Sequence, residues 1–231
     1  MKLPKLDTPV YELNIPSTKK ILKYRPFLVK EHKILLTMIE ASDDEIGRIV
    51  KEIISSCTLN DIDIDELTYF DLEYIFLKLR SKSIGEAVNV QITCVCGSKI
   101  NTTYNIDDLE LKINEEHSSI IQLNDSYGIM MQYPSLQEII SVYSKKDTSS
   151  VIDLVINNLR SIFNKDNLWE AKDLDKKEIE EFVLSLTKEQ FEKIETFFQT
   201  APKVSQKIEG DCASCNTHQI RYLEGLSNFF V

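Results

Sequence analysis

Two short cysteine motifs, more than a hundred residues apart, constrain the fold of this chain most. The first is Cys94-Val-Cys96-Gly and the second is Cys212-Ala-Ser-Cys215, and apolar and polar residues alternate beside both. This alternation predicts that each motif forms the tip of a β-hairpin. Two cysteines on each tip give four thiolates, the ligand set of many structural zinc sites. We therefore predict one structural Zn²⁺ bound by Cys94, Cys96, Cys212 and Cys215 in a zinc-ribbon-like junction.

Other states of these cysteines stay open at this stage. The spacing Cys-x-Cys is tighter than the usual structural zinc pair, so reduced thiols without metal, a disulfide and an iron–sulfur centre are alternatives. Burial as small apolar residues is less consistent with the motifs, because polar turn residues surround them. His218 is an alternative ligand in place of one cysteine. The fifth cysteine, Cys57, lies on an apolar helical face and is expected in the core.

The cysteine motifs also end two stretches that resemble each other, which predicts an internal duplication. Residues 67–79 resemble residues 186–198 at an offset of 119, and the same offset relates the second cysteine of each motif. Further upstream, the sequence around Pro26 resembles that around Pro134 at a shorter offset, so the second copy needs an inserted helix near 176–185. Self-similarity over a long period indicates a repeated supersecondary unit. A chance match of two helix-then-hairpin patterns is the alternative.

Periodicity and turn residues predict an α+β fold in which both copies run hairpin, helices and cysteine-tipped hairpin. We expect an N-terminal arm at 1–9, a first repeat at 10–113 and a second repeat at 114–231. The arm and the apolar tail at 223–230 are expected to bind partners and to be dispensable for folding. Opening hairpins are expected within 10–24 and 120–131, a strand at 109–113, and helix starts near Leu28, Ser42, Thr68, Ser135, Ser149, Lys176 and Thr187.

Composition argues against several kinds of partner. The formal charge of −10 disfavours general nucleic-acid binding, because phosphates select surfaces rich in lysine and arginine. No apolar run reaches the roughly 18 to 20 residues of a membrane span. The start of the chain lacks the apolar segment of a signal peptide, and paired cysteines suit a reducing compartment, so a cytoplasmic location is expected. The partner is expected to be protein.

No motif for catalysis is present. The sequence has no phosphate-binding glycine loop, nucleophile elbow or His-Glu-x-x-His pattern. His32 and His117 have no partner at the spacing of a general base or metal ligand, and both are expected to be solvated. Four cysteines predict a closed structural site instead of an open catalytic one. The chain is therefore not expected to be an enzyme.

Stretches at both ends and in the first half carry a resemblance to a known family. They are Leu3–Leu13, Lys23–Glu31 with Ile34–Leu36, Phe70–Leu77 with Lys82–Glu86, and Leu223–Phe230. With them the chain resembles the baseplate hub subunit and hub assembly proteins of T4-like contractile-tailed bacteriophages. The resemblance implies a structural role in tail assembly through contacts with hub proteins, in the host cytoplasm during assembly or in the virion baseplate. It implies no reaction and says nothing about zinc.

A function of another class is kept as the alternative. A zinc-ribbon adaptor that binds host or phage transcription or replication machinery also suits an acidic chain with a four-cysteine site. Proteins that co-purify from infected cells would separate the two, because a hub factor brings down tail proteins. The sequence does not predict an oligomeric state.

Overall fold

Helices and strands are mixed along the chain, as the predicted α+β class requires. The computed structural model describes residues 6–38, 41–60, 62–136, 138–139 and 148–224. Most of the predicted arm, the tail beyond Glu224 and much of the helix expected from Ser135 therefore lie outside the described residues. The contacts divide the chain into two compact units, which are residues 1–112 with 203–231 (unit 1) and residues 113–202 (unit 2).

Unit 1 opens with the predicted hairpin, β1 (Tyr11–Asn14) and β2 (Ile21–Tyr24), which pair antiparallel. Three helices follow at the predicted places, namely α1 (Val29–Thr37), α2 (Asp43–Cys57) and α3 (Tyr69–Ile84). The Thr68 hydroxyl caps α3, and Gly85 ends it at a φ of 129°. Helix α3 forms the core of this part, because its largest apolar side chains are buried: Leu72, Ile75, Phe76, Leu77 and Leu79.

A buried ion pair joins the opening hairpin to the helices. The Arg25 guanidinium donates to Glu31 Oε1 at 2.8 Å and to the carbonyl oxygen of Ser56 at 2.7 Å. Glu31 Oε2 also accepts from the Leu28 amide at 2.8 Å and so caps α1. Cys57 is fully buried beside Arg25, which confirms its expected place in the core.

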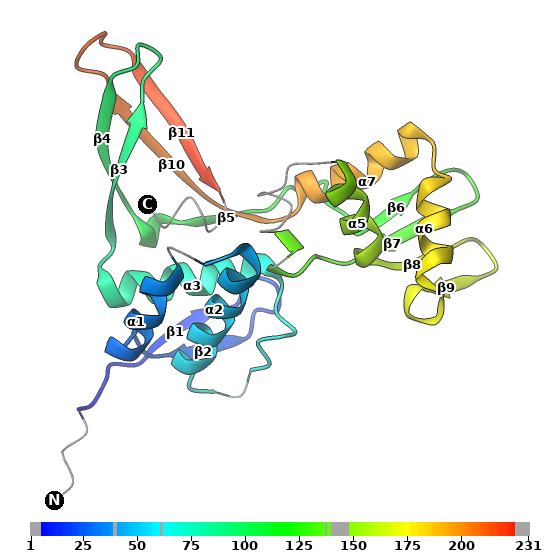
Figure 1. The fold of residues 1–231 in the computed structure, drawn as a ribbon, viewed down its shortest axis with the longest axis horizontal. Helices are drawn as coiled ribbons and strands as arrows, with labels where there is room; N and C mark the ends of the chain where they lie inside the picture. Colours follow the sequence, from blue (N-terminus) through cyan, green and yellow to red (C-terminus); the bar gives the residue numbers. More distant parts are fainter. Residues whose placement is uncertain (1–5, 39–40, 61, 137, 140–147, 225–231) are drawn as a thin grey trace, which may run out of the picture. The chain divides into compact units, whose positions relative to one another are not determined.

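Two hairpins complete unit 1 and come from distant parts of the sequence. One is β3 (Ala87–Thr93) with β4 (Lys99–Asn105), and the other is β10 (Lys203–Asp211) with β11 (His218–Glu224). The short helix η2 (Ile106–Asp108) leads into β5 (Glu110–Lys112), which adds to β10 so that the sheet order is β11-β10-β5. The two hairpins lie side by side with their tips at the same end (Figure 1).

A close backbone approach holds these hairpins together. The Thr102 hydroxyl of β4 donates to the Glu209 carbonyl of β10 at 2.8 Å. A Cβ atom on Gly210 would lie 2.8 Å from Cγ2 of Ile100, closer than side chains approach in proteins. Glycine at this position therefore allows β10 to contact β4.

Unit 2 is a four-stranded antiparallel sheet covered by helices. The sheet order is β6 (Ile120–Gln122), β7 (Gly128–Met131), β8 (Leu159–Phe163) and β9 (Leu168–Glu170). The helices are α5 (Thr148–Asn158), η3 (Ala171–Asp173), α6 (Lys176–Leu184) and α7 (Lys188–Thr200). Sheet and helices share one apolar core, with Ile129, Val155, Ile162, Val183, Ile194 and Phe197 among its buried members.

Two expectations for unit 2 were incomplete or wrong. The β8–β9 hairpin was not predicted, because α5 passes into β8 without a linker and its apolar residues continue the helical pattern. His117 is not solvated as expected: its Nδ1 lies 2.9 Å from Thr200 Oγ1 and its Nε2 lies 2.9 Å from the Tyr133 hydroxyl. The ring also stacks on Phe197, and this burial lowers the pKa of His117.

Candidate metal centre

Each cysteine motif forms a tight turn at the tip of its hairpin, as the alternation predicted. In the first turn, the Gly97 amide donates to the Cys94 carbonyl at 2.9 Å, and Gly97 has a φ of 86°. In the second, the Asn216 amide donates to the Cys212 carbonyl at 2.8 Å, and Asn216 has a φ of 55°. Glycine and asparagine are the residues that adopt these positive φ values most readily. Both turns therefore close on the carbonyl of their first cysteine and end in a residue with positive φ, although the second turn is one residue longer.

The four sulfur atoms converge on one point. Cys94 Sγ lies 3.6 Å from Cys215 Sγ, and Cys96 Sγ lies 3.6 Å from Cys212 Sγ, so each short contact crosses between the hairpins. All four sulfurs lie within 4.8 Å of one another. Zinc–sulfur bonds of about 2.3 Å in a tetrahedron require sulfur–sulfur edges of about 3.8 Å. The two contacts of 3.6 Å are close to this edge length and all the others are at most 4.8 Å, so the cluster is of a size that can close around a tetrahedral ion. Its contacts are longer than the roughly 2.05 Å of a disulfide.

Nearby hydrogen bonds stabilise thiolates at two of the cysteines. The Ser98 hydroxyl and amide donate to Cys96 and lower the pKa of its thiol to about 6. The Cys215 and Ser214 amides lower the pKa of the Cys212 thiol in the same way. The Cys96 amide donates to Cys94, but burial and the other sulfurs outweigh this bond and raise the pKa of Cys94 to about 12. A cation bound between the four sulfurs would offset the repulsion between neighbouring thiolates, because metals bind cysteine in its deprotonated form.

Burial also distinguishes the cysteines within each pair. Cys94 and Cys212 are buried, whereas Cys96 and Cys215 are exposed to solvent. His218, the alternative ligand, lies outside the group of four. Its Nδ1 lies 2.8 Å from Asp211 Oδ1, and this contact raises the pKa of His218. The structure therefore brings together all four predicted cysteines and gives the histidine a carboxylate partner.

Comparison with known proteins relates nearly the whole chain to one family. Residues 8–231 match the family described as T4 bacteriophage base plate protein. No curated protein and no solved structure matches the chain significantly. Among the described residues, no helix is long and apolar enough to cross a membrane.

Proposed function

Since the chain belongs to the T4 bacteriophage base plate protein family, we propose that it is a non-enzymatic component or assembly factor of the baseplate hub. Membership over residues 8–231 is the observation that carries this proposal, and it implies a protein of the phage tail. The finer role rests on contacts with other tail proteins, made first in the host cytoplasm during assembly. The match favours this role over the transcription or replication adaptor. A four-cysteine site alone does not indicate an adaptor, because it is compatible with either role.

We propose further that Cys94, Cys96, Cys212 and Cys215 bind one structural Zn²⁺. The support is the close approach of all four sulfurs and the number of protein ligands, since four cysteines fill the coordination sphere of a structural zinc ion. The ion would join β3–β4 to β10–β11 and so close a loop of more than a hundred residues. Its role is to fix the two hairpin tips, and no reaction is assigned to it.

An internal duplication, with repeats at 10–113 and 114–231, is proposed on matching local structure. The pairs that support it are the caps Thr68 and Thr187 and the turn residues Gly97 and Asn216, each at the offset of 119. In both halves the residue after the second strand also donates its amide to the last residue of a later helix, α2 in the first half and α5 in the second. The Arg25 amide donates to the Cys57 carbonyl, and the Gln132 amide donates to the Asn158 carbonyl. The inserted helix expected near 176–185 corresponds to α6.

The proposed role is tested by purifying tagged protein from phage-infected cells and identifying its partners by mass spectrometry. We expect baseplate and tail proteins in stoichiometric amounts. Polymerase or clamp subunits in their place would overturn the proposal and favour the adaptor.

Both chain ends are proposed as partner-binding segments. Leu6, in the described part of the arm, is 90% exposed, and β1 begins only at Tyr11. Removing residues 1–9 should therefore change the free energy of unfolding by less than about 0.5 kcal/mol while weakening co-purification of tail proteins. Thermal melting and the same pull-down measure the two effects. A large drop in melting temperature with co-purification intact would indicate a structural arm.

A further inference from the structure

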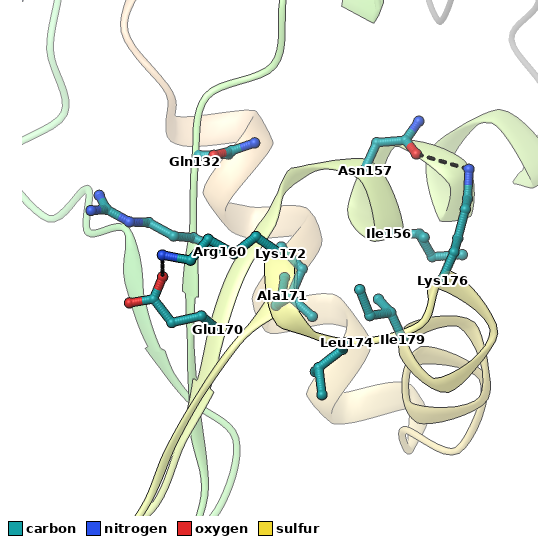
Figure 2. Close-up of a pocket in the computed structure, with 11 residues that line it drawn as sticks. Gln132, Ile156, Asn157, Arg160, Glu170, Ala171, Lys172, Leu174, Lys176 and Ile179 are labelled. Atoms are coloured by element: carbon teal, nitrogen blue, oxygen red, sulfur yellow. Dashed lines mark hydrogen bonds and ion pairs between the residues drawn. The ribbon is translucent and has the colours of Figure 1, made fainter.

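Unit 2 contains an open pocket that is separate from the cysteine cluster. Its volume is about 640 Å³, within the range of pockets that bind ligands. Figure 2 shows apolar side chains at its centre, with Ile156 from α5, Leu174 before α6 and Ile179 within α6. Polar side chains stand on both sides of this apolar floor. On one side lie Glu170 and Lys172, and on the other lie Asn157 and Lys176.

The rim of the pocket is basic although the chain as a whole is acidic. Three cations, Arg160, Lys172 and Lys176, line it together with one carboxylate, Glu170, whereas the whole chain carries a formal charge of −10. Lys172 pairs with Glu170 at 2.9 Å. Lys176 donates to the neutral Asn157 amide oxygen at 3.3 Å, and Arg160 lies close enough to Glu170 to help Lys172 lower the pKa of that carboxyl. Because three cations face one carboxylate, the pocket keeps an excess of positive charge for a carboxylate from another molecule.

We infer that this pocket binds an acidic segment of a partner protein, with an apolar side chain on the floor between carboxylates that meet Arg160 and Lys176. The inference deepens the proposed function and rests on it, since it gives the chemistry of a tail protein that this chain contacts. Complementary charge selects such a segment and disfavours nucleic acid, because the apolar floor matches neither phosphate nor ribose.

Arginine and lysine have different roles in this arrangement. The planar Arg160 guanidinium suits a bidentate contact with one carboxylate, whereas Lys176 acts as a point charge at the first turn of α6. Reversing both charges is a mild change for the fold, because both residues are exposed. A glutamate at position 176 also suits the positive end of a helix dipole.

The test measures binding of a fluorescent peptide to the full-length protein by anisotropy at low salt. The probe is a peptide of about ten residues in which leucine is spaced among glutamates, and the control probe has glutamine at each glutamate. We expect the acidic probe to bind and the neutral probe not to bind. The Arg160→Glu/Lys176→Glu variant should bind the acidic probe about tenfold more weakly. Lys188→Glu, an exposed charge reversal outside the pocket, should change binding by less than about twofold.

Equal binding by the double variant, equal binding of the neutral probe, or displacement of the peptide by inorganic phosphate at the same concentration would overturn the inference. The pull-down from infected cells separates failure of the pocket inference from failure of the proposed baseplate function. If the double variant and the wild type bring down tail proteins equally, the pocket has no part in the contact and the proposed function stands. If the wild type brings down no tail protein although the acidic probe binds as expected, the proposed function fails and the pocket chemistry is supported.

Discussion

Unit 2 and the paired hairpins of unit 1 are held together by different means. In unit 2, residues from the sheet and the helices form one continuous apolar core. In the hairpin pair, the strands bury single residues such as Val88, Ile92 and Ile100, and β11 buries only Gln219 among its described residues. Toward the tip, in 93–99 and 209–218, the buried residues are Cys94 and Cys212. Apolar burial thus stabilises unit 2, while the hairpin tips lack it.

The difference gives the proposed metal a structural role at the hairpin tips that unit 2 does not require. A two-stranded hairpin is marginally stable in water by itself, and the tips have too little apolar surface to join two of them. Four converging thiols give a local cross-link in place of a core. We therefore expect changes at the cysteines and changes in the unit 2 core to affect separate parts of the molecule.

The largest effect is expected from loss of a cysteine ligand. Cys94→Ser and Cys212→Ser should each reduce zinc from about one ion per chain to none, as measured by elemental analysis. The cost should be several kcal/mol, a share of the roughly 10 to 16 kcal/mol that structural zinc contributes. Hydrogen exchange should speed up in β3, β4, β10 and β11 while α7 stays protected. The double variant should lose little more, because the first substitution already removes the ion.

Cys57→Ala is the matched control, since Cys57 is buried away from the cluster. It should keep the zinc at full occupancy. Retention of one ion per chain in either serine variant would contradict the four-ligand site. An absorption spectrum of iron in the purified protein would instead identify a different metal in the same thiolate cage.

The next largest effect is expected in the core of unit 2. Phe197 is 2% exposed and stacks with His117 and Tyr133. Phe197→Ala should destabilise unit 2 by about 3 to 5 kcal/mol, because it removes buried apolar surface and leaves a cavity. The zinc content should stay unchanged. Urea titrations followed by hydrogen exchange should show unchanged protection of the backbone amides in the hairpins. Loss of zinc in this variant would show that the two parts unfold as one.

Much of this comparison was predictable from the sequence. Local patterns sufficed for the two cysteine hairpins and for helix starts such as those at Ser42, Thr68 and Thr187, since each depends on neighbours in the chain. The resemblance to T4-like baseplate proteins is also confirmed at the family level. Which cysteines contact each other, such as Cys94 and Cys215, was not predictable, because it depends on how two distant hairpins meet.

The partners of His117 were missed because they too are distant in sequence. Thr200 lies 83 residues away. A turn signal for β8–β9 was available in Asn164–Asn167, where the Asn164 side chain accepts two backbone amides.

A smaller, pH-dependent effect is expected at the Arg25–Glu31 pair of unit 1. Burial raises the pKa of Glu31, but hydrogen bonds from Arg25, the Leu28 amide and Lys30 outweigh it and lower the pKa from 4.5 to about 2. Because the folded pKa is the lower one, the stabilisation is complete above about pH 4.5 and is lost as pH falls toward 2. Between pH 7 and pH 3 this carboxylate should account for about 2 kcal/mol.

Urea unfolding of wild type and Glu31→Gln at the two pH values isolates that contribution, since acid release of zinc affects both proteins alike. The difference in stability between them should shrink by about 2 kcal/mol at pH 3. An unchanged difference would mean that Glu31 has an ordinary pKa. In unit 2, Glu138 instead contacts the neutral Asn158 amide at 3.3 Å.

The smallest effect is expected where the two hairpins touch away from the cysteines. Alanine at position 210 would place its Cβ 2.8 Å from Ile100 Cγ2, so Gly210→Ala should cost about 1 to 2 kcal/mol by overpacking. Because β4 must then move away from β10, zinc affinity should fall although all four ligands are intact, which competition with a chelator measures. Ile100→Ala removes the clashing methyl group, so Gly210→Ala should cost almost nothing in that background. An equal cost in both backgrounds would show that the glycine acts through backbone freedom and not through contact between the hairpins.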